Sequence, residues 1–144
     1  RGGRAFIKTT SGGQNIGIGA MALRVNVSND GNVAIGYQSM QDASGAELNT
    51  AVGNNAMRGT IDVDITGDYN TAVGAGSLKD NTTGVNTAIG FCASGKNTTG
   101  THNTVVGACA GYLNETGGCN TVMGDHAMHY NTGNYNTASG QESL

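Results

Sequence analysis

The chain has 144 residues, of which 25 are glycine, none is proline or tryptophan, and only 12% are charged. This composition excludes a charge-driven disordered chain and is unlike that of an ordinary compact enzyme. The net charge of −3 argues against a nucleic-acid partner, which requires a basic face, and no apolar run reaches the length of a membrane span.

Residues 1–14 form a lead-in or cap that precedes the repetitive part of the chain. Within it, residues 5–10 are predicted to form a short strand, and Ser11, Gly12 and Gly13 a turn. Because the chain opens on Arg1 and ends on a repeat, we expect it to be a piece of a longer polypeptide.

Residues 15–144 repeat one short phrase eight times, and a fixed short period predicts a solenoid. Each copy begins with an asparagine, and successive copies are spaced by 17, 17, 21, 16, 17, 17 and 16 residues. These residues, called the asparagine column, are Asn15, Asn32, Asn49, Asn70, Asn86, Asn103, Asn120 and Asn136.

Other positions of the phrase are equally regular. Four residues after each asparagine comes the glycine column, which predicts positive φ or close backbone approach: Gly19, Gly36, Gly53, Gly74, Gly90, Gly107, Gly124 and Gly140. Three residues after each asparagine comes the apolar column: Ile18, Ile35, Val52, Val73, Ile89, Val106 and Met123, broken at Ser139. Small residues stand two positions after the asparagine, and leucine or methionine mostly eight after it.

Alternation of apolar and small residues is typical of strands, and the remainder of each unit has turn chemistry. We therefore predict an all-β fold, a parallel β-roll or β-solenoid of about eight coils of 16–17 residues. Each coil is expected to contain two strands of about five residues. Stacking of coils is expected to leave the apolar column partly exposed to solvent. We therefore expect this column to pack against identical chains around an axis.

The phrase from Asn49 to Met57, and likewise from Asn32 to Met40, resembles the head repeat of trimeric autotransporter adhesins. It resembles still more closely the Asn-Thr-Ala-x-Gly repeat of bacteriophage tail fibres. The resemblance covers residues 15–144 and implies a left-handed parallel β-roll in which three chains form a homotrimeric rod. It also implies surface attachment rather than catalysis, with a host glycan or receptor and neighbouring fibre segments as partners.

The predicted function is thus a structural segment of an extracellular fibre, most closely a virion tail fibre that presents turns for host attachment. One alternative is a bacterial cell-surface adhesin or extracellular fibril subunit. Another is a monomeric solenoid whose threonine ladder, one residue after the asparagine column, binds ice or a glycan. No convergent acid, base or nucleophile set is visible, so neither an enzyme nor a cofactor is expected.

The 21-residue spacing marks an insertion near residues 58–68. Its carboxylates, Asp62, Asp64 and Asp68, are weak candidates for calcium, since the twelfth position of the loop is Val73 rather than glutamate. A solvated bulge is the more ordinary interpretation. If any loop makes specific contacts, we expect it to be this one, because loops on rigid scaffolds often carry function.

His126 is a second weak metal candidate, if three chains bring three copies to a common axis. His126 and His129 would face opposite sides of a strand, so one chain cannot easily chelate with both, and a solvated turn is the simpler interpretation. Cys92 and Cys109 share a position in successive units, where packed thiols are expected and a bridge between coils is the alternative.

Four glycosylation sequons begin at Asn26, Asn81, Asn97 and Asn114. The last three recur at one predicted turn and would line a single edge with glycans. The alternative is that Asn-Thr-Thr-Gly is chosen for its turn chemistry and the sequon follows from composition.

Overall fold

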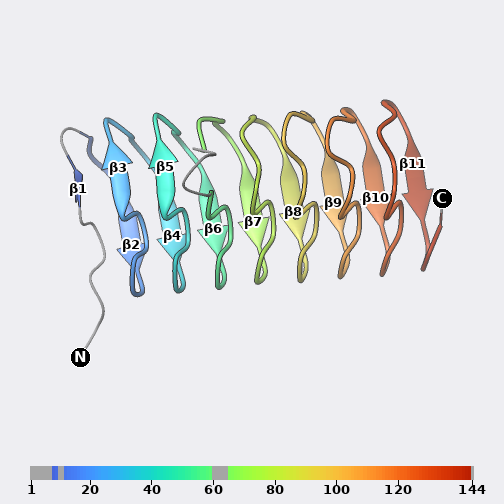
Figure 1. Cartoon of the computed structure of the whole chain (residues 1–144), viewed down its shortest axis with the longest axis horizontal. Helices are drawn as coiled ribbons and strands as arrows, with labels where there is room; N and C mark the ends of the chain where they lie inside the picture. The colour runs from blue at the N-terminus through green and yellow to red at the C-terminus, as the bar shows by residue number, and fades with distance from the viewer. Residues whose placement is uncertain (1–7, 10–11, 60–64, 144) are drawn as a thin grey trace.

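The computed structural model describes residues 8–9, 12–59 and 65–143, and in these residues the chain is an all-β parallel solenoid without helices. One strand from each coil joins an eight-stranded parallel sheet, whose first and last strands along the sequence lie at opposite ends of the stack (Figure 1). In order, its strands are β2 (Ile16–Ile18), β4 (Val33–Ile35), β6 (Thr50–Val52), β7 (Thr71–Val73), β8 (Thr87–Ile89), β9 (Thr104–Val106), β10 (Thr121–Met123) and β11 (Thr137–Ser139).

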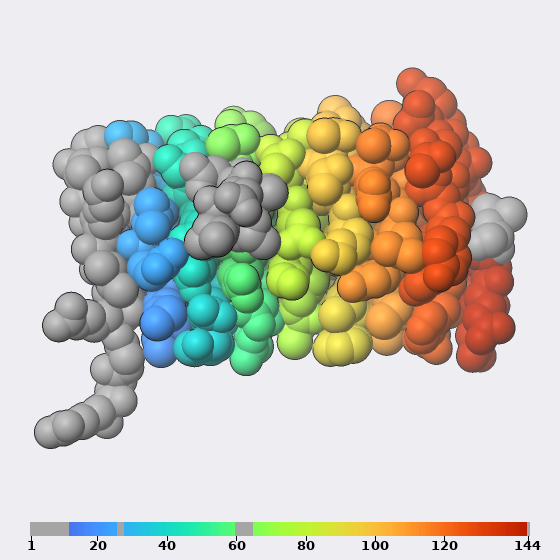
Figure 2. Space-filling model, viewed as in Figure 1, coloured from blue at the N-terminus to red at the C-terminus, as the bar shows by residue number. Residues whose placement is uncertain are grey.

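The register of this sheet matches the repeat position for position. Ala51 lies opposite Ala72 and Ala72 opposite Ala88, so every column of the sequence is a column in space. The 21-residue unit keeps this register, with Val52 opposite Val73, so the insertion is accommodated outside the sheet. Successive coils appear as successive colour bands along the body, each beside its neighbours in sequence (Figure 2).

The prediction of two five-residue strands per coil is wrong for most of the chain. All strands of the eight-stranded sheet have three residues, and a second sheet contains only β1 (Lys8–Thr9), β3 (Val25–Val27) and β5 (Asp42–Ser44). An isolated bridge from Ala43 to Ile65 extends it by one step. Later coils place Asn-Thr-Thr-Gly or related turns on that side, whose side-chain hydrogen bonds replace a strand ladder.

The hydrophobic core is a narrow stripe inside the coils. The middle residue of each strand from β4 to β11 points inward and is buried, and it packs with the buried leucines and methionines eight positions after the asparagine. Eight positions after the asparagine, two coils have Ser94 and Gly111 in place of leucine or methionine. The middle residue of β9 and of β10 is valine rather than alanine. A Cβ added to Gly111 would lie 3.5 Å from a methyl of Val105, so this valine fills the space that the glycine leaves.

The glycine column has the conformation that the sequence predicts. Its φ angles lie between 113° and 144°, and a Cβ on any member except Gly140 would come within 2.5 Å of the carbonyl oxygen of the next glycine. Real Cβ atoms do not approach backbone so closely. Glycine is therefore required both by the backbone angle and by the next coil.

Three further columns have positive φ although most of their members are not glycine. They stand immediately before the asparagine and six and eight residues after it, and their non-glycine φ angles lie between 45° and 62°. Val85 is among them, which is unusual because a β-branched side chain disfavours this region. These residues turn the corners of every coil, and their recurrence shows that stacking imposes the conformation.

The asparagine column forms a buried hydrogen-bonded ladder along the whole stack. The backbone N–H of each asparagine donates to the side-chain Oδ1 of the asparagine one coil earlier, over seven successive steps with lengths from 2.7 to 3.0 Å. The side-chain Nδ2 of the first seven asparagines donates to a backbone carbonyl on the far side of the coil, such as Gly117 for Asn103 at 2.9 Å, whereas that of Asn136 donates to the Oδ1 of Asn120 at 3.1 Å. The ladder therefore satisfies polar groups that the coil could not otherwise bury.

Candidate binding surfaces

The outer face of the eight-stranded sheet carries the apolar column beside a column that is mostly threonine, and it is uncovered in the described part of the single chain. The apolar column points outward, with Ile18 58%, Ile89 41% and Met123 55% exposed. The prediction that stacking leaves this column partly wet is confirmed. All but two of the large exposed hydrophobic residues belong to this face or border its strands: Ile16, Ile18, Tyr37, Leu48, Tyr69, Val73, Val85, Ile89, Phe91, Met123 and Tyr135.

The threonine column shares this outer face, one residue after each asparagine. Thr50, Thr71 and Thr87 are half-buried, whereas Thr104 and Thr121 are exposed. The hydroxyls that bridge coils lie elsewhere, in the turns, where Thr82 donates to the carbonyl of Thr98 at 2.6 Å and Thr83 to that of Gly100 at 2.8 Å. Side-chain hydrogen bonds between coils therefore come from the asparagine column and from the threonines of the turns, such as Thr82 and Thr83.

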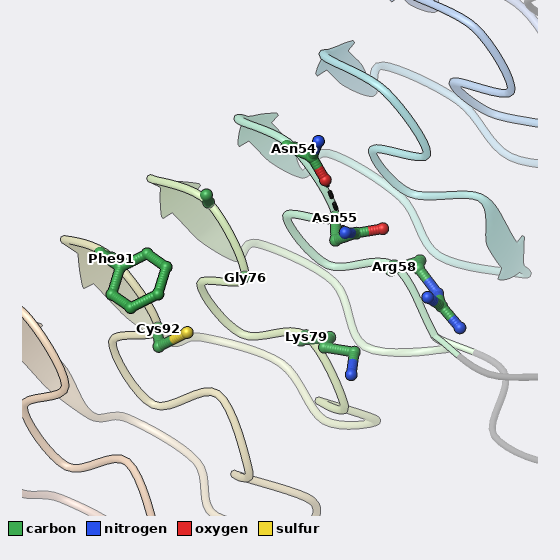
Figure 3. A pocket seen from close by; sticks show the side chains of 8 residues that line it. Asn54, Asn55, Arg58, Gly76, Lys79, Phe91 and Cys92 are labelled. Carbon is green, nitrogen blue, oxygen red and sulfur yellow. Dashed lines mark hydrogen bonds between the residues drawn. The ribbon is translucent and has the colours of Figure 1, made fainter.

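A groove of about 300 Å³ lies at one corner of the solenoid, where three coils meet (Figure 3). Its floor is Ala75 and Gly76, two small residues at positions where the neighbouring coils carry larger side chains. Its walls and rim come from those larger side chains and from two cations, namely Asn54, Asn55, Arg58, Lys79, Phe91 and Cys92.

The two cations of the groove are the ones without an ion pair among the described side chains. Arg24 pairs with Asp42 at 2.6 Å and Lys96 with Asp80 at 2.8 Å, whereas Arg58 and Lys79 have no such carboxylate partner in the described part of the chain. The Nε of Arg58 donates to the carbonyl of its neighbour Gly59 at 3.3 Å. The groove therefore offers positive charge to a ligand.

The thiol of Cys92 closes one side of the groove. Its burial raises the pKa of the Cys92 thiol, nearby Cys109 raises it further, and Lys79 lowers it. The thiol consequently stays protonated at neutral pH and adds no negative charge beside the cations. Cys92, Cys109 and Cys119 are all free thiols in this structure, the last of them exposed.

Of the calcium candidates, Asp62 and Asp64 lie outside the described residues. Asp68 lies within them and has a structural partner, since its Oδ1 accepts the backbone N–H of Glu47 at 2.8 Å. Its backbone carbonyl accepts the N–H of Val85 one coil later. The contacts of Asp68 therefore tie three coils together.

The two histidines lie on the same side of the chain, contrary to the expectation that they face opposite sides. The rings of His126 and His129 stack with centroids 5.5 Å apart, and Tyr112 continues the stack at 5.7 Å from His129. The expectation fails because His126 has positive φ, so strand alternation does not apply to this corner. The Nδ1 of His126 lies 3.1 Å from Asp125, at the exposed surface.

Three of the four sequon asparagines are buried in the folded chain, which favours the turn-chemistry alternative over glycosylation at those positions. Asn81, Asn97 and Asn114 are at most 1% exposed. The Nδ2 of Asn97 donates to the carbonyl of Gly100 at 2.9 Å, and its Oδ1 accepts the N–H of the same residue at 3.0 Å. The turn-chemistry interpretation explains these asparagines. Asn26 belongs to β3, and its side chain lies outside the described part of the structure.

No metal-binding cluster of three or more His, Cys, Asp or Glu side chains occurs within residues 8–9, 12–59 and 65–143. The same residues contain no helix long and apolar enough to cross a membrane. No family model, curated protein or solved structure matches this chain. Functional inference therefore depends on the surfaces described above.

Proposed function

We propose that the chain is a structural segment of an extracellular fibre, of the bacteriophage tail-fibre kind, which assembles as a homotrimer and presents its surface to a host cell. The observation that carries the proposal is the exposed apolar column on the outer face of the eight-stranded sheet. Contiguous exposed apolar surface of this kind marks an interaction site in soluble proteins.

Parallel sheets are normally covered on both faces, and here the coil covers only the inner one. The apolar column repeats once per coil over the length of the stack, so a partner that covers all of it must repeat with the same spacing. A copy of the same chain has this spacing. The resemblance of the repeat to tail-fibre and adhesin repeats, in which three chains associate, supports three copies.

The mechanism of such a segment is mechanical. The asparagine ladder and the in-register sheet give stiffness along the axis, and burial of the apolar column between chains would oppose unravelling of a coil. The turns and corners away from the seam remain accessible to a host surface. An attachment fibre requires both an interface that holds its chains together, here the apolar column, and exposed corners that can contact a host.

A single charge placed in the apolar column tests the assembly. We expect Ile89→Asp to reduce the native mass toward that of the 14.5 kDa single chain, because the substitution brings unpaired carboxylates into the seam. Residue 89 points out of the coil, so circular dichroism should remain that of the wild type. Sedimentation velocity at micromolar concentration measures both species.

The matched control is Thr99→Asp, which adds the same charge at an exposed turn. This variant should sediment as the wild type does. Equal masses for the wild type, Ile89→Asp and Thr99→Asp would contradict the proposed seam, as would dissociation of both variants to the same extent.

A further inference from the structure

We propose that the groove over Ala75 and Gly76 binds an acidic saccharide, with Arg58 and Lys79 holding the anionic group and Phe91 contacting the apolar face of the sugar ring. The inference names a ligand class for the attachment role, and it rests on the proposed function for its biological meaning. The anionic group is a carboxylate or a phosphate, and the experiment below distinguishes the two.

The shape of the groove follows from a local break in the repeat. Six residues after the asparagine, Gly76 stands between Asn55 of the preceding coil and Cys92 of the next, so one side chain is missing from the row. Ala75 likewise stands between Asn54 and Phe91. The resulting volume of about 300 Å³ is at the lower end of ligand sites and fits one sugar ring rather than a long oligosaccharide.

The charge of the groove comes from two cations in the same position of successive coils. Arg58 and Lys79 both stand nine residues after an asparagine, and their side chains lie beside each other along the rim (Figure 3). The terminal nitrogens of both side chains have no hydrogen-bond partner among the described residues. A planar guanidinium next to an ammonium suits an oxyanion with two or three oxygens.

The nearby described carboxylates do not compete for this charge. Asp42 is held by Arg24, and Asp80 by Lys96. The thiol of Cys92 is kept in its neutral form by burial. Among the described residues, therefore, no carboxylate neutralises Arg58 or Lys79.

The opposite side of the groove provides the contacts that a sugar ring needs. Phe91 is 60% exposed and offers an aromatic face to the C–H groups of a pyranose. Asn55 donates to the Oδ1 of Asn54 at 2.5 Å, and its own Oδ1 is buried without a donor among the described residues. Asn54 is exposed and lines the groove, so its side chain is the one of this pair that a sugar hydroxyl can reach.

Ligand-observed NMR titration of the intact 144-residue chain tests the proposal with three probes, namely methyl glucuronide, glucose 6-phosphate and neutral methyl glucoside. We expect an anionic probe to bind about tenfold or more tightly than the neutral one, and the affinity to fall at high salt. Preference for the glucuronide assigns a carboxylate ligand, and preference for the phosphate assigns a phosphorylated one.

Two kinds of variant locate the site. Arg58→Gln should weaken binding of the anionic probe by about tenfold, since it removes a charge-assisted contact. Gly76→Asn should abolish binding by filling the floor with the side chain found at Asn55, and asparagine tolerates the positive φ of this residue. Lys96→Gln is the matched control, because this lysine is already paired and lies outside the groove.

Equal binding of the charged and neutral probes would overturn the inference, as would equal binding by the wild type and Arg58→Gln. These results are separable from failure of the proposed fibre. A trimeric mass without saccharide binding contradicts the groove alone, and a monomer that binds the anionic probe contradicts the assembly alone.

Discussion

Replacing Gly107 with alanine should destabilise the chain by more than about 4 kcal/mol, the range reached only when a substitution breaks a specific structural requirement. The new Cβ would lie 2.3 Å from the carbonyl oxygen of Gly124 and 2.6 Å from its carbonyl carbon. The φ of Gly107 is 142°, which alanine adopts only with strain. The two costs act together because the neighbouring coil fixes the backbone from which the Cβ projects.

Gly140→Ala is the matched control within the same column. Its φ is 113°, but no heavy atom lies within 4 Å of its added Cβ, so only the backbone strain remains, at about 1–3 kcal/mol. Urea unfolding followed by circular dichroism should therefore rank the wild type above Gly140→Ala, and both well above Gly107→Ala. Similar midpoints for the two variants would show that close packing between coils does not require the glycine column.

Asn103→Ala should cost roughly 2–4 kcal/mol, because the buried N–H of Asn120 loses its acceptor at about 1–3 kcal/mol and a buried space opens. The Gly117 carbonyl loses one donor but keeps the Nδ2 of Asn114 at 3.0 Å. The lost acceptor serves the N–H of Asn120 at 3.0 Å, and the lost donor serves the carbonyl of Gly117 at 2.9 Å. Thr104→Ala, at the adjacent exposed position, should change the free energy of unfolding by less than about 0.5 kcal/mol. Chemical denaturation of both variants gives the comparison.

Asn103→Asp separates hydrogen bonding from shape. The carboxylate keeps an acceptor for Asn120 but faces the Gly117 carbonyl without a proton to donate, so burial should raise its pKa in the folded state. The folded variant then holds its proton more tightly than the unfolded one, and its deficit relative to the wild type should shrink as the pH falls toward about 4. A deficit independent of pH would contradict the role assigned to the Asn103 amide.

Much of the architecture could be predicted because the solenoid turns sequence columns into spatial columns. The in-register pairing, the requirement for glycine at Gly107 and the outward direction of Ile89 all follow from an unbroken period. The burial of the asparagine column does not follow from the period. A repeat gives position in the coil, whereas burial depends on how the coil closes on itself.

The corners could not be predicted, and the misplaced histidines have that origin. Leucine, methionine and valine carry no local preference for positive φ, so Met57 and Val85 gave no signal of the left-handed backbone that stacking imposes on these corners. The same corners shortened the strands to three residues. The groove depends on two small residues, Ala75 and Gly76, and the repeat alone does not show that the larger side chains of the neighbouring coils enclose them.

The native mass of the purified wild-type chain tests the central claim most directly. Light scattering coupled to size exclusion should give about 43 kDa, three chains of 14.5 kDa each, because the exposed apolar column then lies buried between copies. A mass of 14.5 kDa at concentrations well above micromolar would contradict the trimeric fibre and leave a self-contained solenoid with its outer sheet face open to a different ligand.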